Sequence, residues 1–264
     1  DMERLLPAMI VAAVLVLRRV AAGDLTLEQP LASILPRDDL VGLNRFGGVD
    51  HADEITVRDV LAHTSGIPNY YAQKALGRLI ETIYGCSLTA ALDSELLGPL
   101  GMGDTALLTP EALGLFDTAS PLLHGTQHYR GARRLASLGA EGALVSTTAD
   151  TMRFLRAVFE GEVLDPATLA LALRERLPLF PRATYGIGVM ALSLPRMLTR
   201  LPKPGVLLGH AGMTGHVMFA EPTSGLYAVG TINQLASPRL SFRLLVGALR
   251  AVRKRNPLAS ESRS

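Results

Sequence analysis

Lysine, cysteine and tryptophan are scarce in this sequence of 264 residues. It has one cysteine and no tryptophan, and its 26 basic residues include three lysines, Lys74, Lys203 and Lys254. The single cysteine, Cys86, excludes an intrachain disulfide and a metal site made of several cysteines, and it leaves the redox compartment open. So few lysines also leave few places where a lysine amine could activate a nucleophile.

Charge is sparse as well. Charged residues make up 19% of the chain, the formal net charge is +2, and the basic residues are scattered except over 250–255. Without a basic face, no nucleic-acid partner is expected. The hydrophobic content of 48% excludes a disordered chain and is enough for a sizeable core.

The apolar run over residues 5–17 (LLPAMIVAAVLVL) is shorter than the roughly 20 residues that span a bilayer. An acidic residue precedes it and Arg18 and Arg19 follow it, so a buried helix is favoured over a signal peptide. The chain begins with Asp1, which is not a translation start. Either an upstream segment has been removed or Asp1 is a leftover ahead of Met2.

The pattern of apolar residues and turn residues predicts an α+β fold, with helices packed on an antiparallel sheet. Gly23 is expected to end the first helix and Thr56 to cap the second. Residues 1–264 are interpreted as one domain, with a helical part over about 50–180 and a sheet-forming part over about 183–252 plus helix 8–22. The expected helices are 8–22, 57–62, 75–84, 87–97, 148–160 and 241–252, and the expected strands are 185–194, 217–220 and 226–232.

Three general motifs are set aside. The G-x-G-x-x-A pattern at 186–191 is expected inside a strand, and Pro195 prevents the helix that a dinucleotide site needs. His124 and His128 have the spacing of metal ligands on a helix, but the neighbouring glycine and proline make a helix improbable there. Cys86 is interpreted as packed and not nucleophilic. No metal or cofactor is therefore predicted.

Several short motifs follow one another in a more specific order. They are 55–68 (ITVRDVLAHTSGIP), 99–105 (PLGMGDT), 142–154 (GALVSTTADTMRF), 185–188 (YGIG), 210–212 (HAG), 221–222 (EP), Gly225 and 231–233 (TIN). Together they resemble the serine β-lactamase and penicillin-recognising family, which includes class C β-lactamases, DD-carboxypeptidases and related esterases. The resemblance covers about residues 8–252. It implies a β-lactamase/transpeptidase-like fold with a helical subdomain, and hydrolysis of an amide or ester through an acyl-serine.

The resemblance also assigns roles at the end of the sheet. The strand ending in 210–212 is expected to border the site, with His210 in place of a lysine that helps to bind or protonate the substrate. Gly212 would let the substrate backbone approach, and the Met213 amide would complete the oxyanion hole. A plain structural histidine on a strand is the alternative for His210. His63 and Ser65 are expected to form a turn and not a catalytic pair.

Two catalytic motifs of the family are not found. Acyl transfer needs a serine with a lysine three residues later, and spacing back from Gly23 puts that motif at Leu6 and Met9. No S-x-x-K occurs anywhere, because the residues three places before the lysines are Tyr71, Arg200 and Ala251.

The Y-x-N motif is absent too, because the turn at 63–66 runs almost directly into the helix that follows it in relatives. A remnant of the motif would be Tyr71 as a catalytic residue and Gln73 as a substrate-binding amide. A segment between Lys74 and Ala75 is expected to be missing, together with the first two strands of the family's sheet.

These differences leave three functional hypotheses open. The first is a serine hydrolase by descent whose acyl transfer is impaired in this chain. The second is an active carboxypeptidase, β-lactamase or esterase with S-x-x-K upstream or in an omitted segment, and the third is a protein that binds peptidoglycan-like or acyl ligands without turnover. The expected ligand is a lactam, a D-Ala peptide or an ester. Relatives are often exported, yet the sequence assigns no compartment.

The last predicted strand, 226–232, has no partner on one side if the two N-terminal strands are missing. An open strand edge pairs readily with another chain. Self-association through residues 226–232 is therefore expected.

Overall fold

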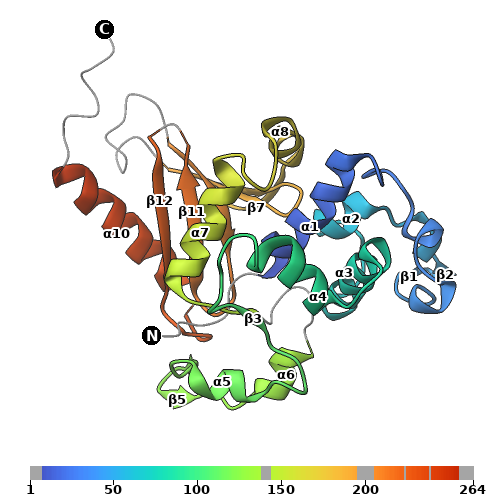
Figure 1. Cartoon of the computed structure of the whole chain (residues 1–264), viewed down its shortest axis with the longest axis horizontal. Helices are drawn as coiled ribbons and strands as arrows, with labels where there is room; N and C mark the ends of the chain where they lie inside the picture. The colour runs from blue at the N-terminus through green and yellow to red at the C-terminus, as the bar shows by residue number, and fades with distance from the viewer. Residues whose placement is uncertain (1–7, 138–143, 195–204, 223, 238, 256–264) are drawn as a thin grey trace, which may run out of the picture.

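The computed structural model describes residues 8–137, 144–194, 205–222, 224–237 and 239–255 (Figure 1). Its centre is a six-stranded antiparallel sheet in the order β12-β11-β10-β9-β8-β7. The strands are β7 (Leu177–Phe180), β8 (Ala183–Tyr185), β9 (Met190–Ser193), β10 (Val206–Ala211), β11 (His216–Glu221) and β12 (Leu226–Thr231). Each strand pairs with the next in sequence, which confirms the predicted antiparallel sheet of an α+β fold.

Helices and short strand pairs surround this sheet. The helices are α1 (Ala8–Ala22), α2 (Val57–Leu61), α3 (Asn69–Tyr84), α4 (Leu88–Leu92), α5 (Gly114–Thr118), α6 (Ala132–Ala136), α7 (Thr148–Phe159), α8 (Pro166–Arg174) and α10 (Arg239–Arg255). The short strands are β1 (Arg45–Phe46), β2 (Val49–Asp50), β3 (Ala106–Leu107), β4 (Leu123–His124), β5 (Gln127–His128) and β6 (Leu144–Val145), and single helical turns cover Leu31–Ser33, Arg37–Asp39, Ala52–Glu54 and Asp93–Leu97. No helix in the described ranges is both long and apolar enough to cross a membrane.

Both faces of the sheet are covered. Along β11, Val217 and Phe219 pack with residues of α10 in one cluster, whereas Met218 packs with α1 and α7 in the main core. Successive side chains of a strand point to opposite faces, so α10 and the α1/α7 layer lie on opposite faces of the sheet. Figure 1 shows α7 across the front of the strands and α10 beside β12.

The apolar run forms the predicted buried helix. Each of the ten residues Ala8–Leu17 in α1 is at most 2% exposed. The Tyr84 hydroxyl donates a hydrogen bond to the Leu15 carbonyl at 3.0 Å and so ties α3 to α1. Gly23 ends the helix with φ 80°, as predicted, because glycine adopts this left-handed conformation without strain.

The strand predicted over 185–194 is interrupted. Gly186, Ile187 and Gly188 form the turn of the β8–β9 hairpin, so the G-x-G-x-x-A pattern starts in a turn and not inside a strand. Gly188 has φ +69°, and a Cβ there would lie 2.1 Å from the Cβ of Ala13. Its N–H donates to the Leu61 carbonyl at 3.0 Å. This turn therefore packs directly against α1 and α2, and only glycine allows so close an approach.

Helix α3 starts at Asn69, six residues earlier than predicted. Its first turn follows Pro68, whose carbonyl accepts hydrogen bonds from the N–H groups of Tyr71 and Ala72. The apolar periodicity begins at Leu76, about two turns later, and for that reason the prediction missed the start. Gly85 ends α3 in the left-handed conformation, as expected.

Candidate functional site

The turn after α2 directs His63 toward the sheet. The Thr56 hydroxyl accepts a hydrogen bond from the Asp59 N–H at 3.2 Å, and the Asp59 carboxylate accepts one from the Thr56 N–H at 3.0 Å, so α2 starts with a capping box. After the helix ends, His63 has φ 57°, which residues other than glycine rarely adopt. In this conformation its ring centroid lies 5.0 Å from that of Tyr185 on β8.

Thr64 and Ser65 fix this turn. The Thr64 hydroxyl donates to the Asp59 carboxylate at 3.0 Å, and the Ser65 hydroxyl accepts from the Ile67 N–H at 3.4 Å. Ser65 is 7% exposed, and its carbonyl accepts a hydrogen bond from the Asn44 amide at 2.9 Å. These bonds agree with the interpretation of the segment as a turn.

Tyr185 and His210 form the central contact of the site. The Tyr185 hydroxyl and the Nε2 atom of His210 are 3.0 Å apart, and the two rings stand nearly perpendicular, at 87°, with centroids 5.6 Å apart. Tyr185 is 6% exposed. The Nδ1 atom of His210 is shielded from solvent and has no hydrogen-bond partner among the described residues. The hydroxyl of Tyr185 therefore orients the imidazole on β10.

A third histidine lies on the same face of the sheet. His210 is directly opposite Met218, and His216 is two residues before Met218 on β11, so the three side chains share one face. His216 is 2% exposed, and neither of its ring nitrogens has a hydrogen-bond partner in the described part of the chain.

Burial controls the charge of these imidazoles. It lowers the pKa of His216 to about 3, with a smaller contribution from the nearby His210. Burial likewise lowers the pKa of His210 to about 4, with a smaller contribution from His63. Burial also lowers the pKa of His63. His210 and His216 are therefore neutral at pH 7, and each carries one donor and one acceptor nitrogen.

The turn between β10 and β11 holds Gly212 and Met213. The Gly212 N–H donates to the His216 carbonyl at 2.9 Å, and the Gly215 N–H donates to the Gly212 carbonyl at 3.1 Å. Met213 is at the tip, with its side chain 73% exposed. Among the described residues, no acceptor binds the Met213 N–H. This N–H can therefore donate to an oxygen of a ligand.

The two residues predicted as a remnant of Y-x-N lie on the first turns of α3. Tyr71 is 49% exposed, and the hydrogen-bond partner of His210 is Tyr185 and not Tyr71. The side chain of Gln73 lies outside the described residues. The roles of Tyr71 and Gln73 in the site therefore stay predictions.

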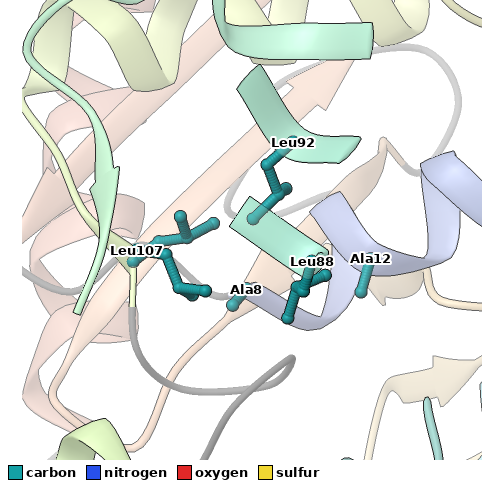
Figure 2. A pocket seen from close by; sticks show the side chains of 6 residues that line it. Ala8, Ala12, Leu88, Leu92 and Leu107 are labelled. Carbon is teal, nitrogen blue, oxygen red and sulfur yellow. The ribbon is translucent and has the colours of Figure 1, made fainter. Parts of the chain in front are cut away.

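The position that the resemblance gives to the catalytic lysine is part of the core. Met9 lies in the first turn of α1 and is 2% exposed, and Leu6 lies outside the described residues. A narrow gap in the packing next to this turn has no room for a water molecule, and the described residues that line it are alanines and leucines. Figure 2 shows the side chains of Leu88, Leu92 and Leu107 gathered near Ala8 and Ala12. The described lining of this gap offers no polar group for catalysis.

His124 and His128 do not share a helix, in agreement with the prediction. They lie on the two strands of the β4–β5 hairpin. Over the described ranges, no group of three or more histidine, cysteine or acidic residues is placed to hold a metal ion.

Sequence patterns did not mark Tyr185 or His216 as site residues, and they marked His63 only as part of a turn. Tyr185 was marked only as the first residue of the Y-G-I-G motif. The alternation along β11, with His216 on the same face as Met218, was the signal for His216. The contact between His63 and Tyr185 joins segments 122 positions apart in the sequence (185 − 63), and no local pattern contains it.

Comparisons with known proteins agree on one family. The family model described as Beta-lactamase matches residues 10–251. A search of curated proteins found no match. Three solved structures share the fold, each with low sequence identity. They are D-amino acid amidase from Ochrobactrum anthropi SV3 with D-phenylalanine (TM-score 0.73, 20% identity, covering 96% of this chain and 86% of that chain), simvastatin synthase (LovD) from Aspergillus terreus (0.72, 17%, 96% and 84%) and a penicillin-binding protein from Bacillus halodurans (0.67, 16%, 94% and 85%).

Proposed function

The chain belongs to the beta-lactamase family, a serine hydrolase-type family, and from that premise we propose that it binds a small acyl-bearing ligand without forming an acyl-serine. One observation carries this proposal: no serine in the 264 residues is followed three positions later by a lysine. At the matching position Met9 is buried in the core. The resemblance implies acyl transfer by a serine nucleophile and a lysine base, and this sequence has neither of them at the required spacing.

The end of β10 supports the binding part of the proposal. His210, held by Tyr185, can donate or accept one hydrogen bond as a neutral imidazole. The Met213 N–H can donate to a carbonyl or carboxylate oxygen of the ligand. Gly212 next to it has no side chain to obstruct the approach. A ligand with an oxygen acceptor and an adjacent amide or ester group matches these three features.

The names of the similar structures support a small-molecule ligand. They describe an amidase bound to D-phenylalanine, a simvastatin synthase and a penicillin-binding protein. We therefore keep a lactam, a D-Ala peptide and a simple ester as the ligand classes to test. Loops around the site select among such ligands, so the fold alone does not.

Acylation is tested with a fluorescent penicillin and with p-nitrophenyl acetate. We expect no covalent label and no hydrolysis above that of a heat-denatured sample. Cys86 is exposed and could itself be acetylated, so the Cys86→Ser variant is measured in parallel. A stoichiometric adduct on any residue of this variant, located by mass spectrometry, overturns the proposal.

Binding is tested separately by thermal shift and by NMR titration with acetyl-D-Ala-D-Ala and with penicillin G. We expect weak, saturable binding in the wild type. The affinity should be about tenfold lower in His210→Ala, because a hydrogen-bonding group of the site is lost. The matched control is His51→Ala, a partly exposed histidine paired with Glu54 far from β10. Equal affinities in both variants contradict a ligand site at the end of β10.

We further propose that two copies of the chain associate through β12. This strand is the last one at its edge of the described sheet, and its six residues contain no charge and no proline, which are features that normally protect an edge. The Ile232 N–H donates to the Gly215 carbonyl, so every second residue of β12 before Ile232 bonds to β11. The N–H and C=O groups of Tyr227, Val229 and Thr231 therefore point away from β11, toward the open edge.

The oligomeric state tests this pairing. We expect a concentration-dependent dimer in sedimentation velocity, and a shift to monomer in Val229→Pro, which removes an outward N–H. The control is Gly225→Ala in the turn before β12. A wild-type protein that stays monomeric at about 100 µM overturns the proposal.

A further inference from the structure

A second cavity lies apart from α1, between α5, the β4–β5 hairpin and the start of α6. Its volume is about 350 Å³. Its apolar wall includes Phe116, the ring of Tyr129 and Leu122, which is 1% exposed. These residues belong to a small hydrophobic cluster separate from the main core. The wall can therefore receive an apolar group without disturbing the core around α1.

Charged side chains of both signs line the same cavity. Asp117 and Arg130 both lie on it and are exposed, and His128 stands beside them. Neither Asp117 nor Arg130 forms an ion pair with another residue in the described part of the chain. Since the two charges do not neutralise each other, each can bind a group of opposite charge on a ligand.

The walls of the cavity are held in place. The Gln234 side chain donates to the Gly125 carbonyl and accepts from the Gly125 N–H, both at 2.9 Å, which fixes the tip of the β4–β5 hairpin. The ring of Tyr129 lies over Gly131, where a Cβ would be 2.3 Å from the Tyr129 hydroxyl. The position of this ring therefore depends on glycine at 131.

We propose that this cavity binds a zwitterion of the size of a single amino acid with an apolar side chain. Arg130 binds its carboxylate, Asp117 binds its ammonium group, and its side chain packs against Phe116 and Leu122. The volume is at the lower end of the range for small-molecule sites, which suits a ligand of about a dozen non-hydrogen atoms. The guanidinium of arginine matches the two oxygens of a carboxylate.

The proposal is tested with three probes of similar shape: phenylalanine, phenethylamine without the carboxylate, and 3-phenylpropionate without the ammonium group. Binding is followed by NMR titration at pH 7. We expect phenylalanine to bind about tenfold more tightly than either of the other two, because each charged contact adds affinity.

Three variants separate the contacts. Arg130→Gln is expected to weaken the binding of phenylalanine and of 3-phenylpropionate about tenfold and to leave the binding of phenethylamine unchanged. Asp117→Asn is expected to weaken the binding of phenylalanine and of phenethylamine and to leave that of 3-phenylpropionate unchanged. Gly131→Ala, which displaces the Tyr129 ring, is expected to weaken all three. Arg134→Gln, an exposed arginine on α6 that does not line the cavity, is the control and is expected to change nothing.

No saturable binding of phenylalanine up to about 10 mM, or equal affinities in Arg130→Gln and Arg134→Gln, overturns the proposal. The titration is repeated in His210→Ala to keep it distinct from the ligand site on β10. The affinity of His210→Ala for phenylalanine is expected to equal that of the wild type. If it falls as much as in Arg130→Gln, phenylalanine binds at β10, and the assignment to this cavity is overturned. Apart from His210→Ala on β10, these substitutions are on the surface or in a turn, and thermal unfolding checks that each variant is folded.

Discussion

The start of α1 and the end of β10 correspond to two sides of the catalytic site that the family resemblance implies, and they differ sharply in polarity. At the start of α1, Ala8 and Met9 are buried in the main apolar core. At the end of β10, Tyr185 and His210 share a hydrogen bond, and the two ring nitrogens of buried His216 have no hydrogen-bond partner among the described residues. The first region stabilises the fold by apolar burial, and the second region retains polar groups that stability alone does not require.

This difference separates a structural role from the binding role that we propose. A buried polar group without a partner costs free energy, and an apolar side chain in its place would not carry that cost. The comparison predicts that polar substitutions at the start of α1 destabilise the protein strongly. It also predicts that substitutions around β10 change pH dependence and local contacts with smaller losses of stability.

The largest effect is expected from Met9→Lys, which puts the family's amine back at its position. Met9 is 2% exposed and belongs to the main apolar core, so an ammonium group there would be buried among apolar side chains. We expect a loss of about 4 kcal/mol in the free energy of unfolding, measured in urea. Met9→Leu, which keeps the volume, should cost less than about 1.5 kcal/mol. A small loss in Met9→Lys would break the comparison.

Gly188→Ala tests the contact between α1 and the β8–β9 turn. The new Cβ would overlap the Cβ of Ala13, and the backbone at φ +69° disfavours a side chain, so we expect a loss of about 3 kcal/mol. Gly225 has a similar φ, +67°, with open space around it. Gly225→Ala should therefore cost only about 1 kcal/mol, and the difference between the two variants measures the overlap alone. Equal losses would show that Ala13 moves aside freely.

Acid should destabilise the protein through its buried histidines. The unfolded chain takes up protons below the ordinary histidine pKa of 6.5, whereas folded His216 stays neutral down to about pH 3. The unfolded state therefore binds more protons in this window, and stability is complete above pH 6.5 and falls as the pH falls. Between pH 6.5 and about 4.5 we expect His216 to account for a loss of about 2 kcal/mol.

Urea unfolding of His216→Leu across this window checks the effect. The variant should lose less stability on acidification than the wild type. The control is His51→Asn, at a partly exposed histidine directly after β2. An unchanged slope in His216→Leu would mean that His216 is protonated in the folded protein.

The smallest effect is expected from Tyr185→Phe. It removes the hydroxyl that binds Nε2 of His210 and keeps the ring that packs on His63, so the loss should be about 1 kcal/mol. Tyr71→Phe, on a residue that is half exposed, should change stability by less than about 0.5 kcal/mol. A larger loss from Tyr71→Phe than from Tyr185→Phe would show that the Tyr71 hydroxyl makes the stronger contact.

Local patterns predicted much of the fold. The capping residue Thr56 and the terminal glycines Gly23 and Gly85 end or begin helices where they were expected, because each acts on its own turn of backbone. Apolar alternation and turn residues predicted the antiparallel sheet, and the family motifs predicted the place of His210 on it. The interrupted strand at 186–188 was missed because its cause, contact with Ala13 on α1, lies far away in the sequence.

The sequence by itself determined the family, the buried first helix and the absence of S-x-x-K, since motif order, apolar runs and spacing are properties of the chain. Only the tertiary structure decided which groups meet. It placed Tyr185 between His63 and His210, buried His216 on the same face of the sheet, and put Asp117 and Arg130 on one cavity. Such contacts depend on how distant segments pack and on how much water that packing excludes, and no pattern within one segment records either quantity.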